Sequence, residues 1–256
     1  NQVIDDKNIL EDRKTESEKK KKELLALKSQ LQDKKSILDT NKQEKNKLLS
    51  TTKNQESSYK KILAEKKAKM EAFEKELNGY EAALKIAIDP KSIPKAGKGI
   101  LSWPLDKIRI TQLFGRTSDS VRLYASGTHN GVDFAASIGT PVKATLSGTI
   151  EGIGDTDKTC DGASYGKWVL IRHANGLSTL YAHFSLIKVQ PGQSIATGEI
   201  IGYSGNTGYS TGPHLHMSVY ATQGVKISNL KSTVCRGTYT MPIADVKAYL
   251  DPMIYL

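Results

Sequence analysis

The sequence predicts a long α-helical arm followed by an all-β domain, a compact antiparallel sheet or open barrel. Two observations divide the chain. Every histidine, cysteine, tryptophan and proline lies at or beyond Pro90, as do all glycines except Gly79. The residues before this point are rich in lysine and glutamate, whereas the later residues are rich in strand and turn formers. We therefore expect an arm at 1–88, a linker at 89–100 and the β domain at 101–256.

Apolar residues in the first third recur at helical spacing, and no proline occurs between Asp5 and Lys85. One heptad run consists of Leu24, Leu27, Leu31 and Leu38, and a second of Leu63, Met70, Phe73, Leu77, Tyr80 and Leu84. The polar patch Thr51–Ser58 separates the runs and puts them out of register. The arm is therefore either one coiled-coil helix, about 120 Å long at 1.5 Å per residue, or an antiparallel helical hairpin. Because its other faces are charged, it needs a partner helix, from a second copy or another protein.

The linker Asp89–Gly99 interrupts the helical pattern with two prolines. After it, short β-rich runs alternate with turn residues, and Asn175-Gly176 predicts a tight hairpin. The β domain, with about 155 residues, is long enough to bury a core. Only its last residues, Ile243–Leu256, have a partly helical pattern.

The net charge of +10 suggests an acidic partner, such as a nucleic acid, an anionic membrane or an anionic wall polymer. The basic residues are mostly lysines interspersed with glutamates, with no arginine-rich cluster among aromatics. This pattern favours a solvated helix surface, and we expect no nucleic-acid partner. No apolar run approaches the roughly 20 residues that span a bilayer.

Four of the five histidines stand in contexts that suggest a metal site. The segment HNGVD places His129 and Asp133 four residues apart, which is about 13 Å along a straight strand. The chain must therefore bend for both to reach one ion, and Asn130-Gly131 is where it can bend. His183 follows the predicted hairpin in the segment YAHF.

The segment TGPHLH, at 211–216, would place His214 and His216 on one face of a strand. Zinc takes nitrogen and oxygen ligands in a tetrahedron, and a catalytic site leaves one position open. Three ligands from two histidines and Asp133 would leave that position for water, and two histidines would remain for proton transfer. The alternative is that these histidines are independent surface residues.

These motifs, in this order and with glycine-rich turns between them, resemble the lysostaphin-type zinc metallopeptidase domain. The resemblance extends from about Leu101 to Tyr220 and includes the closing YLDP segment near Tyr249. It implies a mostly antiparallel β domain with a groove over the sheet. It also implies cleavage of the peptide cross-links of bacterial peptidoglycan, often at glycyl or D-amino-acid bonds.

The resemblance assigns a role to each histidine. One Zn²⁺ ion would be held by His129, Asp133 and His216. His183 and His214 would be catalytic, activating the water and stabilising the tetrahedral intermediate, without an assignment of which does which. His173, in the segment HANG, would be structural.

Two further features concern the walls of the expected groove. Cys160 lies in an insertion at 154–167 and Cys235 lies near the C-terminus, and in an exported protein they would form a disulfide. Free thiols are the alternative, and the absence of a CxxC motif argues against a second, structural zinc. The insertion would line one wall of the groove, and the segment 116–128 would form a second wall or a lid.

The expected function is a zinc-dependent endopeptidase of peptidoglycan that works outside the cytoplasm, in the periplasm or at the cell surface of a bacterium. The arm would target the enzyme to a membrane-protein partner, dimerise it or inhibit it. The first alternative is a non-catalytic coiled-coil regulator that activates other cell-wall hydrolases, although such regulators typically lose zinc ligands and this chain has not. A scaffold with a wall-binding β domain is the second alternative.

Overall fold

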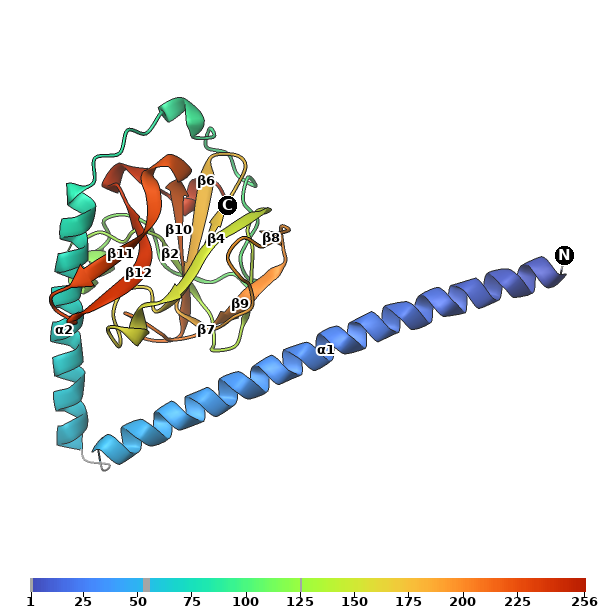
Figure 1. Cartoon of the computed structure of the whole chain (residues 1–256), viewed down its shortest axis with the longest axis horizontal. Helices are drawn as coiled ribbons and strands as arrows, with labels where there is room; N and C mark the ends of the chain where they lie inside the picture. Colours follow the sequence, from blue (N-terminus) through green and yellow to red (C-terminus); the bar gives the residue numbers. More distant parts are fainter. Residues whose placement is uncertain (1, 53–55, 125) are drawn as a thin grey trace. The chain divides into compact units, whose positions relative to one another are not determined.

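The chain contains two compact units, which begin and end as Asn1–Asn54 and Gln55–Leu256 (Figure 1). The computed structural model describes residues 2–52, 56–124 and 126–256. The first unit contains the helix α1, and the second contains the helix α2 together with the β domain. No helix within the described ranges is both long and apolar enough to cross a bilayer.

The helix α1 (Gln2–Thr52) spans 51 residues. Its heptad leucines are exposed, Leu24 at 66% and Leu31 at 68%. Its surface carries ion pairs of the Glu16–Lys20 kind, at 2.6 Å, which contribute only about 0.3–0.5 kcal/mol each. Exposed leucines at this spacing are typical of a helix that pairs with another, and the coiled-coil pairing of α1 stays a prediction.

The polar patch of the arm is where α1 ends and α2 begins. α1 ends at Thr52, and α2 (Glu56–Ala83) starts inside the same patch. Residues 53–55 lie outside the described residues. The choice between a stutter and a hairpin bend depends on these residues and therefore stays open. The long helices followed by an antiparallel β domain confirm the predicted fold class.

The β domain is built from antiparallel strand pairs in three sheets. The strands are β1 (Ile110–Gln112), β2 (Val132–Ala135), β3 (Pro141–Lys143), β4 (Gly148–Asp155), β5 (Lys167–Arg172), β6 (Leu177–Ala182), β7 (Phe184–Ile187), β8 (Ser194–Ile195), β9 (Ile200–Ser204), β10 (His214–Ala221), β11 (Val225–Ser232), β12 (Gly237–Ala244) and β13 (Tyr249–Leu250). Within the described residues the large sheet has the order β1-β2-β10-β6-β5-β4-β8, with β13 beside β10. The smaller sheets are β3-β9-β7 and β11-β12.

Helical segments of the second unit other than α2 are short. They are α3 (Ser118–Leu123) and the 3-10 turns Pro90–Ser92, Thr156–Lys158, Thr222–Gly224, Val246–Ala248 and Pro252–Ile254. The C-terminal residues therefore form single turns around β13 instead of the partly helical segment expected there. Asp245 caps the first of these turns and Asp251 the second, and the proline at the start of the second favours a helical turn.

The predicted hairpin is present between β5 and β6, whose residues Arg172 and Ser178 pair across it. His173 N–H donates to the Leu177 carbonyl oxygen at 2.9 Å, which leaves three residues in the loop, one more than the two-residue turn that Asn175-Gly176 indicates. Gly176 adopts a φ of 87° there, a conformation that favours glycine. The hairpin brings His183, at the end of β6, to the neighbouring strand β10.

The large sheet is buried on both faces, which explains the continuous apolar run of β5. Alternate side chains of β5 enter different cores: Val169 and Ile171 pack into one, and Trp168 and Leu170 into the other. The first core lies against the three-stranded sheet. The second lies against β11, β12 and α2. The site described below therefore rests on strands that are held from both sides.

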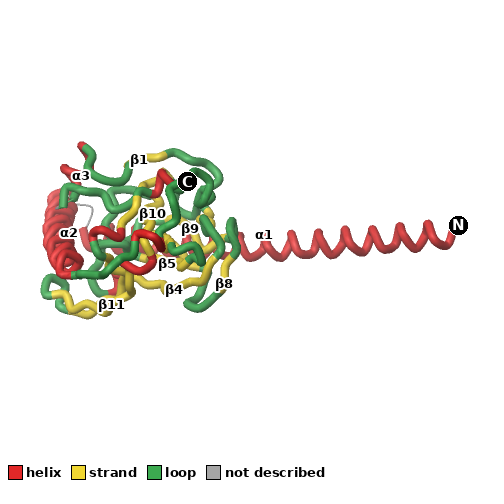
Figure 2. Tube along the Cα trace, turned by 90° about the horizontal axis from the view of Figure 1, so that it is seen from above, coloured by secondary structure: helices red, strands yellow, loops and turns green. Residues whose placement is uncertain are grey.

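The apolar face of α2 packs on the β domain, alongside β11 and β12 (Figures 1 and 2). Phe73 is 1% exposed and its ring lies 4.8 Å from that of Tyr239, and Leu77 is 8% exposed. Fully burying side chains of this kind stabilises the fold by about 1.5–3 kcal/mol each. The later part of the second heptad run thus packs on the β domain, whereas Leu63 is 54% exposed. The domain boundary expected after residue 88 stays a prediction.

Polar contacts also attach α2 to the β11–β12 hairpin. The Glu76 carboxylate accepts hydrogen bonds from Ser232 Oγ at 2.6 Å and from the N–H of Thr233 at 2.7 Å. Tyr80 donates its hydroxyl proton to the Lys231 carbonyl oxygen at 2.8 Å. Lys66 pairs with Asp161 of the insertion at 2.6 Å. These contacts hold α2 along its length, with no group of the metal centre involved.

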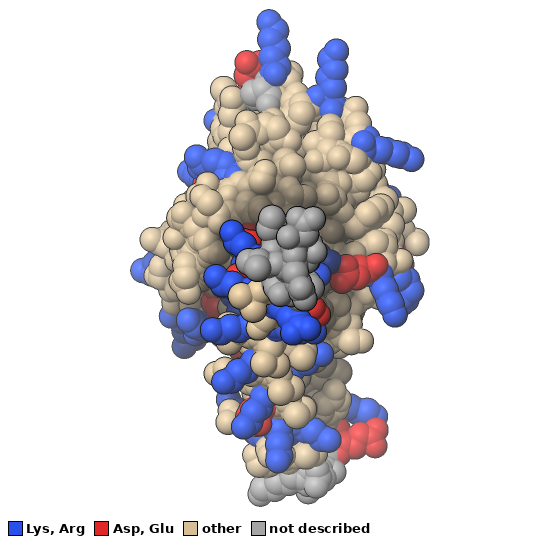
Figure 3. Space-filling model, turned by 90° about the vertical axis from the view of Figure 1, so that its right-hand side faces the viewer, with Lys and Arg blue, Asp and Glu red and all other residues tan. Residues whose placement is uncertain are grey.

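Basic side chains are prominent on one face of the molecule. Figure 3 shows lysine and arginine side chains singly on the upper part of the visible face and more closely set in its middle and lower parts, with acidic side chains beside some of them. The net charge of +10 favours approach to anionic material.

A disulfide joins Cys160 and Cys235, whose Cα atoms are 5.4 Å apart and which are separated by 75 residues in sequence. It ties the insertion after β4 to the turn between β11 and β12. Since α2 contacts both segments, the bond fixes the two parts of the surface on which α2 rests.

We expect the Cys160→Ser, Cys235→Ser double variant to lose about 2–4 kcal/mol of unfolding free energy, because the open chain regains the entropy of a long loop. Urea unfolding of the full chain, followed by tryptophan fluorescence, measures the loss. Reduction of the wild type should reproduce it, and an unchanged midpoint in both cases would contradict the expectation.

Candidate metal centre

Strand register brings the site residues together. β10 lies between β2 and β6 in the large sheet, and its residue His216 pairs with Asp133 on one side and with Ala182 on the other. Residues directly opposite on neighbouring strands point to the same face of a sheet. His214, two residues along β10, shares that face with His216. His183 follows Ala182 directly, and its ring lies 4.5 Å from that of His214 and 5.9 Å from that of His216.

His129 reaches the same place through a bend. Its backbone forms a bridge with Gly115, with N–O distances of 2.9 and 2.8 Å. A Cβ atom at Gly131 would lie 2.4 Å from the Met217 carbonyl oxygen and 2.6 Å from Cε1 of His216. The bend expected at this glycine therefore needs glycine for the close approach of β10.

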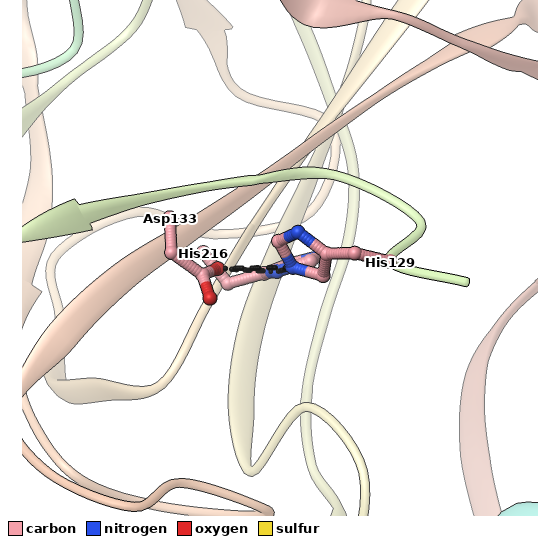
Figure 4. Close-up of side chains that lie close together, drawn as sticks. All are labelled: His129, Asp133 and His216. Carbon is pink, nitrogen blue, oxygen red and sulfur yellow. Dashed lines mark hydrogen bonds and ion pairs between the residues drawn. The ribbon is translucent and has the colours of Figure 1, made fainter. Parts of the chain in front are cut away.

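Three potential ligand atoms converge in the resulting site (Figure 4). Asp133 Oδ1 lies 2.9 Å from His216 Nδ1 and 3.2 Å from His129 Nε2. The two imidazole nitrogens are 3.1 Å apart. All three residues are at least 95% buried, since their exposed fractions are 1%, 5% and 5%. The three ligands expected from the sequence thus form one compact, solvent-excluded group.

The hydrogen bonds on the far side of each ring set its protonation. His129 Nδ1–H donates to the Leu113 carbonyl oxygen at 3.0 Å, which leaves a lone pair on Nε2 when the ring is neutral. His216 Nε2 pairs with the Ser218 hydroxyl at 2.9 Å, on the side away from the other ligands. Partners of this kind orient the ligands of metal sites.

The electrostatics of the site fit a cation between the three atoms. Burial lowers the pKa of His216 and keeps its imidazole neutral. Burial alone would raise the pKa of Asp133, but hydrogen bonds and charge from His129 and His216 outweigh it and hold that pKa below its usual range. Two imidazoles and one carboxylate, facing one another, match the nitrogen and oxygen ligands of a catalytic zinc site.

The two histidines expected to be catalytic lie beside this group. Their rings are 4.5 Å apart between centroids. His183 Nδ1–H donates to the Thr207 carbonyl oxygen at 2.7 Å, and His214 Nδ1–H donates to the Gly212 carbonyl oxygen at 2.8 Å. In each ring Nε2 is therefore the nitrogen that can take up or give a proton. Burial lowers the pKa of His183 well below its usual value, so this ring is neutral.

His183 also adopts a φ of 63°, in the left-handed region. Such a conformation costs a residue with a side chain on the order of 1–3 kcal/mol and persists where the surrounding structure imposes it. Here the Tyr165 carbonyl oxygen accepts the His183 N–H at 2.9 Å and holds the strained residue in place. His173, by contrast, bonds to Ser147 and Thr179 and lies outside the group.

A cavity of about 510 Å³ opens over the site. Its floor includes His183 and His216. The segments expected to form walls both contribute: the insertion provides Ser164 and Tyr165, and the segment before His129 provides Tyr124, Ser126 and Thr128. α2 forms a further wall with Met70, Phe73, Glu74, Leu77, Asn78 and Glu81, which the sequence did not reveal.

Tyr124 is a second residue that sequence reasoning missed. Its ring stacks on His129, with centroids 5.4 Å apart and planes within 2°. It also meets the ring of Tyr209 edge-on at 6.1 Å. No motif marks it, because it is brought to the metal centre by the turn after α3. Stacking of this kind restricts the orientation of a ligand imidazole.

Two buried imidazoles and a carboxylate at one end of an antiparallel sheet, flanked by two further imidazoles, define a metallohydrolase type of centre. Residues 127–229 match the model of peptidase family M23. The chain contains an M23, or lysostaphin-type, peptidase domain preceded by long helices.

Three relatives show where the similarity lies. The chain is 46% identical to the DD-carboxypeptidase/endopeptidase Mpg of Neisseria meningitidis over 128 residues, 50% of this chain and 28% of the relative. It is 40% identical to the peptidoglycan DD-endopeptidase ShyA of Vibrio cholerae over 41% of this chain and 23% of the relative. It is 46% identical to lysostaphin of Staphylococcus staphylolyticus over 35% of this chain and 18% of the relative. The chain thus matches less than a third of the length of these relatives.

We expect Gly131→Ala to weaken zinc binding by at least tenfold, because the new methyl group displaces His216 or β10 and one ligand atom leaves the cluster. Competition with a chromogenic chelator measures the affinity. Gly79→Ala is the matched control, since a Cβ at that helical position meets nothing within 4 Å. Equal affinities for the two variants would contradict the expectation.

Proposed function

We propose that this protein is a zinc-dependent endopeptidase that hydrolyses the peptide cross-links of bacterial peptidoglycan. The observation that carries the proposal is the convergence of the ligand atoms of His129, Asp133 and His216, with the rings of His183 and His214 together and a cavity that His183 and His216 line. One similar protein is named a DD-carboxypeptidase/endopeptidase and another a peptidoglycan DD-endopeptidase, which supports the DD type of cleavage for this chain.

The residues have separable roles in this proposal. His129, Asp133 and His216 hold the zinc ion, which when bound polarises the scissile carbonyl and lowers the pKa of water. The Nε2 atoms of His183 and His214 can take up a proton from the attacking water and donate a hydrogen bond to the developing oxyanion. The hydrogen bonds at the two Nδ1 atoms fix both rings for this work.

The cavity supports a peptide substrate. Its volume lies within the range of sites that hold ligands of several hundred daltons. Aromatic side chains such as Tyr165, Tyr209 and Tyr249 line it together with the amide of Asn130, so it offers both apolar contact and hydrogen bonds to a peptide backbone. The net positive charge favours approach to an anionic wall polymer.

The disulfide supports a location outside the cytoplasm, in the periplasm or at the cell surface, because such bonds persist in oxidising compartments. The exposed leucines of α1 support a coiled-coil contact, either with a second copy of the chain or with a membrane-protein partner. In this proposal the residues before 89 serve as the arm and those after 100 as the peptidase domain.

Single substitutions should separate metal binding from catalysis. His216→Ala should lose both zinc and activity, because two remaining ligands hold the ion weakly. His183→Asn should retain zinc and lose at least about a hundredfold in kcat, because the ring that handles the proton is gone. Asparagine is chosen there because it tolerates the left-handed backbone. Zinc content by mass spectrometry and peptide release from purified peptidoglycan measure the two properties.

His173→Asn is the control, since it also removes a buried imidazole but outside the site. It should keep zinc and activity if the protein remains folded, as circular dichroism reports. Full activity in both His216→Ala and His183→Asn would refute the proposal. A wild type that binds no zinc, cuts no peptidoglycan and stimulates another hydrolase would support the regulator instead.

A further inference from the structure

One carboxylate of α2 is buried against the domain on the cavity side. Glu81 is only 7% exposed and lines the cavity. Its Oε1 accepts a hydrogen bond from the Tyr249 hydroxyl at 2.7 Å and one from the Ala244 N–H at 3.3 Å. Ala244 ends β12 and Tyr249 begins β13, so Glu81 links α2 to the strand that pairs with β10.

Hydrogen bonds continue from Glu81 to the metal centre. Asn130 Nδ2 donates to the Tyr249 oxygen at 3.5 Å and to the Tyr165 oxygen at 3.1 Å. Asn130 is adjacent in sequence to the ligand His129. The ring of Tyr165 lies 5.9 Å from that of His216. Two intervening side chains therefore connect the helix to the wall of the site.

The carboxylate fixes which groups donate and which accept along this chain of hydrogen bonds. An ionised Glu81 can only accept, so the Tyr249 proton points toward α2 and the Tyr249 oxygen faces Asn130. The Asn130 amide then turns its N–H groups to the two phenol oxygens. As a result the Tyr165 oxygen receives a donor, and its own proton is directed away from Asn130.

Docking of α2 does not explain the presence of Glu81. Burial raises its pKa to about 7, which shows that the site disfavours the charge. Glu76, one and a half turns earlier, already fixes the helix with its hydrogen bonds to Ser232 and Thr233. Phe73 and Leu77 supply the apolar contact. A carboxylate kept at an unfavourable position inside a cavity is more typical of a functional site than of a structural one.

The cavity also remains open with α2 in place. It keeps about 510 Å³ although α2 forms one wall. Removing the helix would expose Phe73 and Leu77 and uncover the second core around Trp168. Both observations favour a permanent wall over a cover that must leave before substrate enters.

We propose that Glu81 is a positioning residue of the active site, which acts through Tyr249 and Asn130 to hold Tyr165 and the His129 end of the metal centre in the geometry that cleavage needs. The inference rests on the endopeptidase function proposed above. It makes α2 a working part of the peptidase and not only an arm that leads to it.

The test compares two α2 glutamates that both bind the domain. Glu81→Ala, Glu81→Gln and Glu76→Ala are prepared in the full zinc-loaded chain, and kcat and KM are measured on a soluble cross-linked muropeptide dimer. We expect Glu81→Ala to lower kcat by about tenfold or more with little change in KM, since the loss is one of alignment. Glu81→Gln should restore most of kcat, because its amide oxygen can still accept from Tyr249. Glu76→Ala should lower the melting temperature and leave kcat unchanged.

Three results would overturn the inference. An unchanged kcat in Glu81→Ala would show that Glu81 does not position the active site. An equal loss of kcat in Glu76→Ala would show that Glu81 only helps to attach α2 to the β domain. A higher kcat in Glu81→Ala would show that α2 restrains the site.

A readout independent of activity separates this inference from the proposed function. With ring-labelled tyrosine, the NMR signals of Tyr165 and Tyr249 should shift in Glu81→Ala and stay in place in Glu76→Ala. If the wild type cuts no peptidoglycan, the proposed function fails, yet these spectra still decide whether Glu81 positions the tyrosines. Identical spectra for the two variants would overturn the positioning role.

Discussion

The pairing of β2 with β10 is the constraint on which the site depends. A shift of one residue would turn His214 and His216 to the opposite face of the sheet and separate them from Asp133. The register is held because both faces of the sheet are buried, so that every side chain of β10 has a fixed environment. The same strand register therefore builds the cores and brings Asp133 beside His216, and the bend at Gly131 adds His129.

Backbone groups and aromatic side chains around the site orient its histidines. Backbone carbonyl groups orient His129, His183 and His214 through Nδ1, so each ring presents Nε2. Tyr124 stacks on one ligand, and the phenol of Tyr165 stands beside another. Tyr124 precedes the residues that match the family model, 127–229, and Tyr165 lies in the insertion after β4. The three ligands and the two histidines beside them thus lie inside the matched residues, whereas the segment before His129, the insertion and α2 form walls of the cavity.

Much of the site could be predicted from the sequence, because its chemistry is carried by short motifs. HNGVD and TGPHLH contain the three ligands, and a glycine inside the first motif revealed the bend. The parts that could not be predicted depend on contacts between distant segments. Phe73 and Leu77 have the spacing of a coiled-coil seam, and nothing in that spacing distinguishes a partner helix from the β11–β12 hairpin. Glu81 looks like one more surface glutamate until β13 is placed beside it.

The most direct test of the metal centre is anomalous diffraction at the zinc edge from crystals of the full chain grown with one equivalent of zinc. The account predicts a single strong peak between His129 Nε2, Asp133 Oδ1 and His216 Nδ1, at the end of the cavity that also contains His183. A zinc-loaded protein whose peak lies elsewhere, or whose ion lacks any of these three ligands, would contradict it.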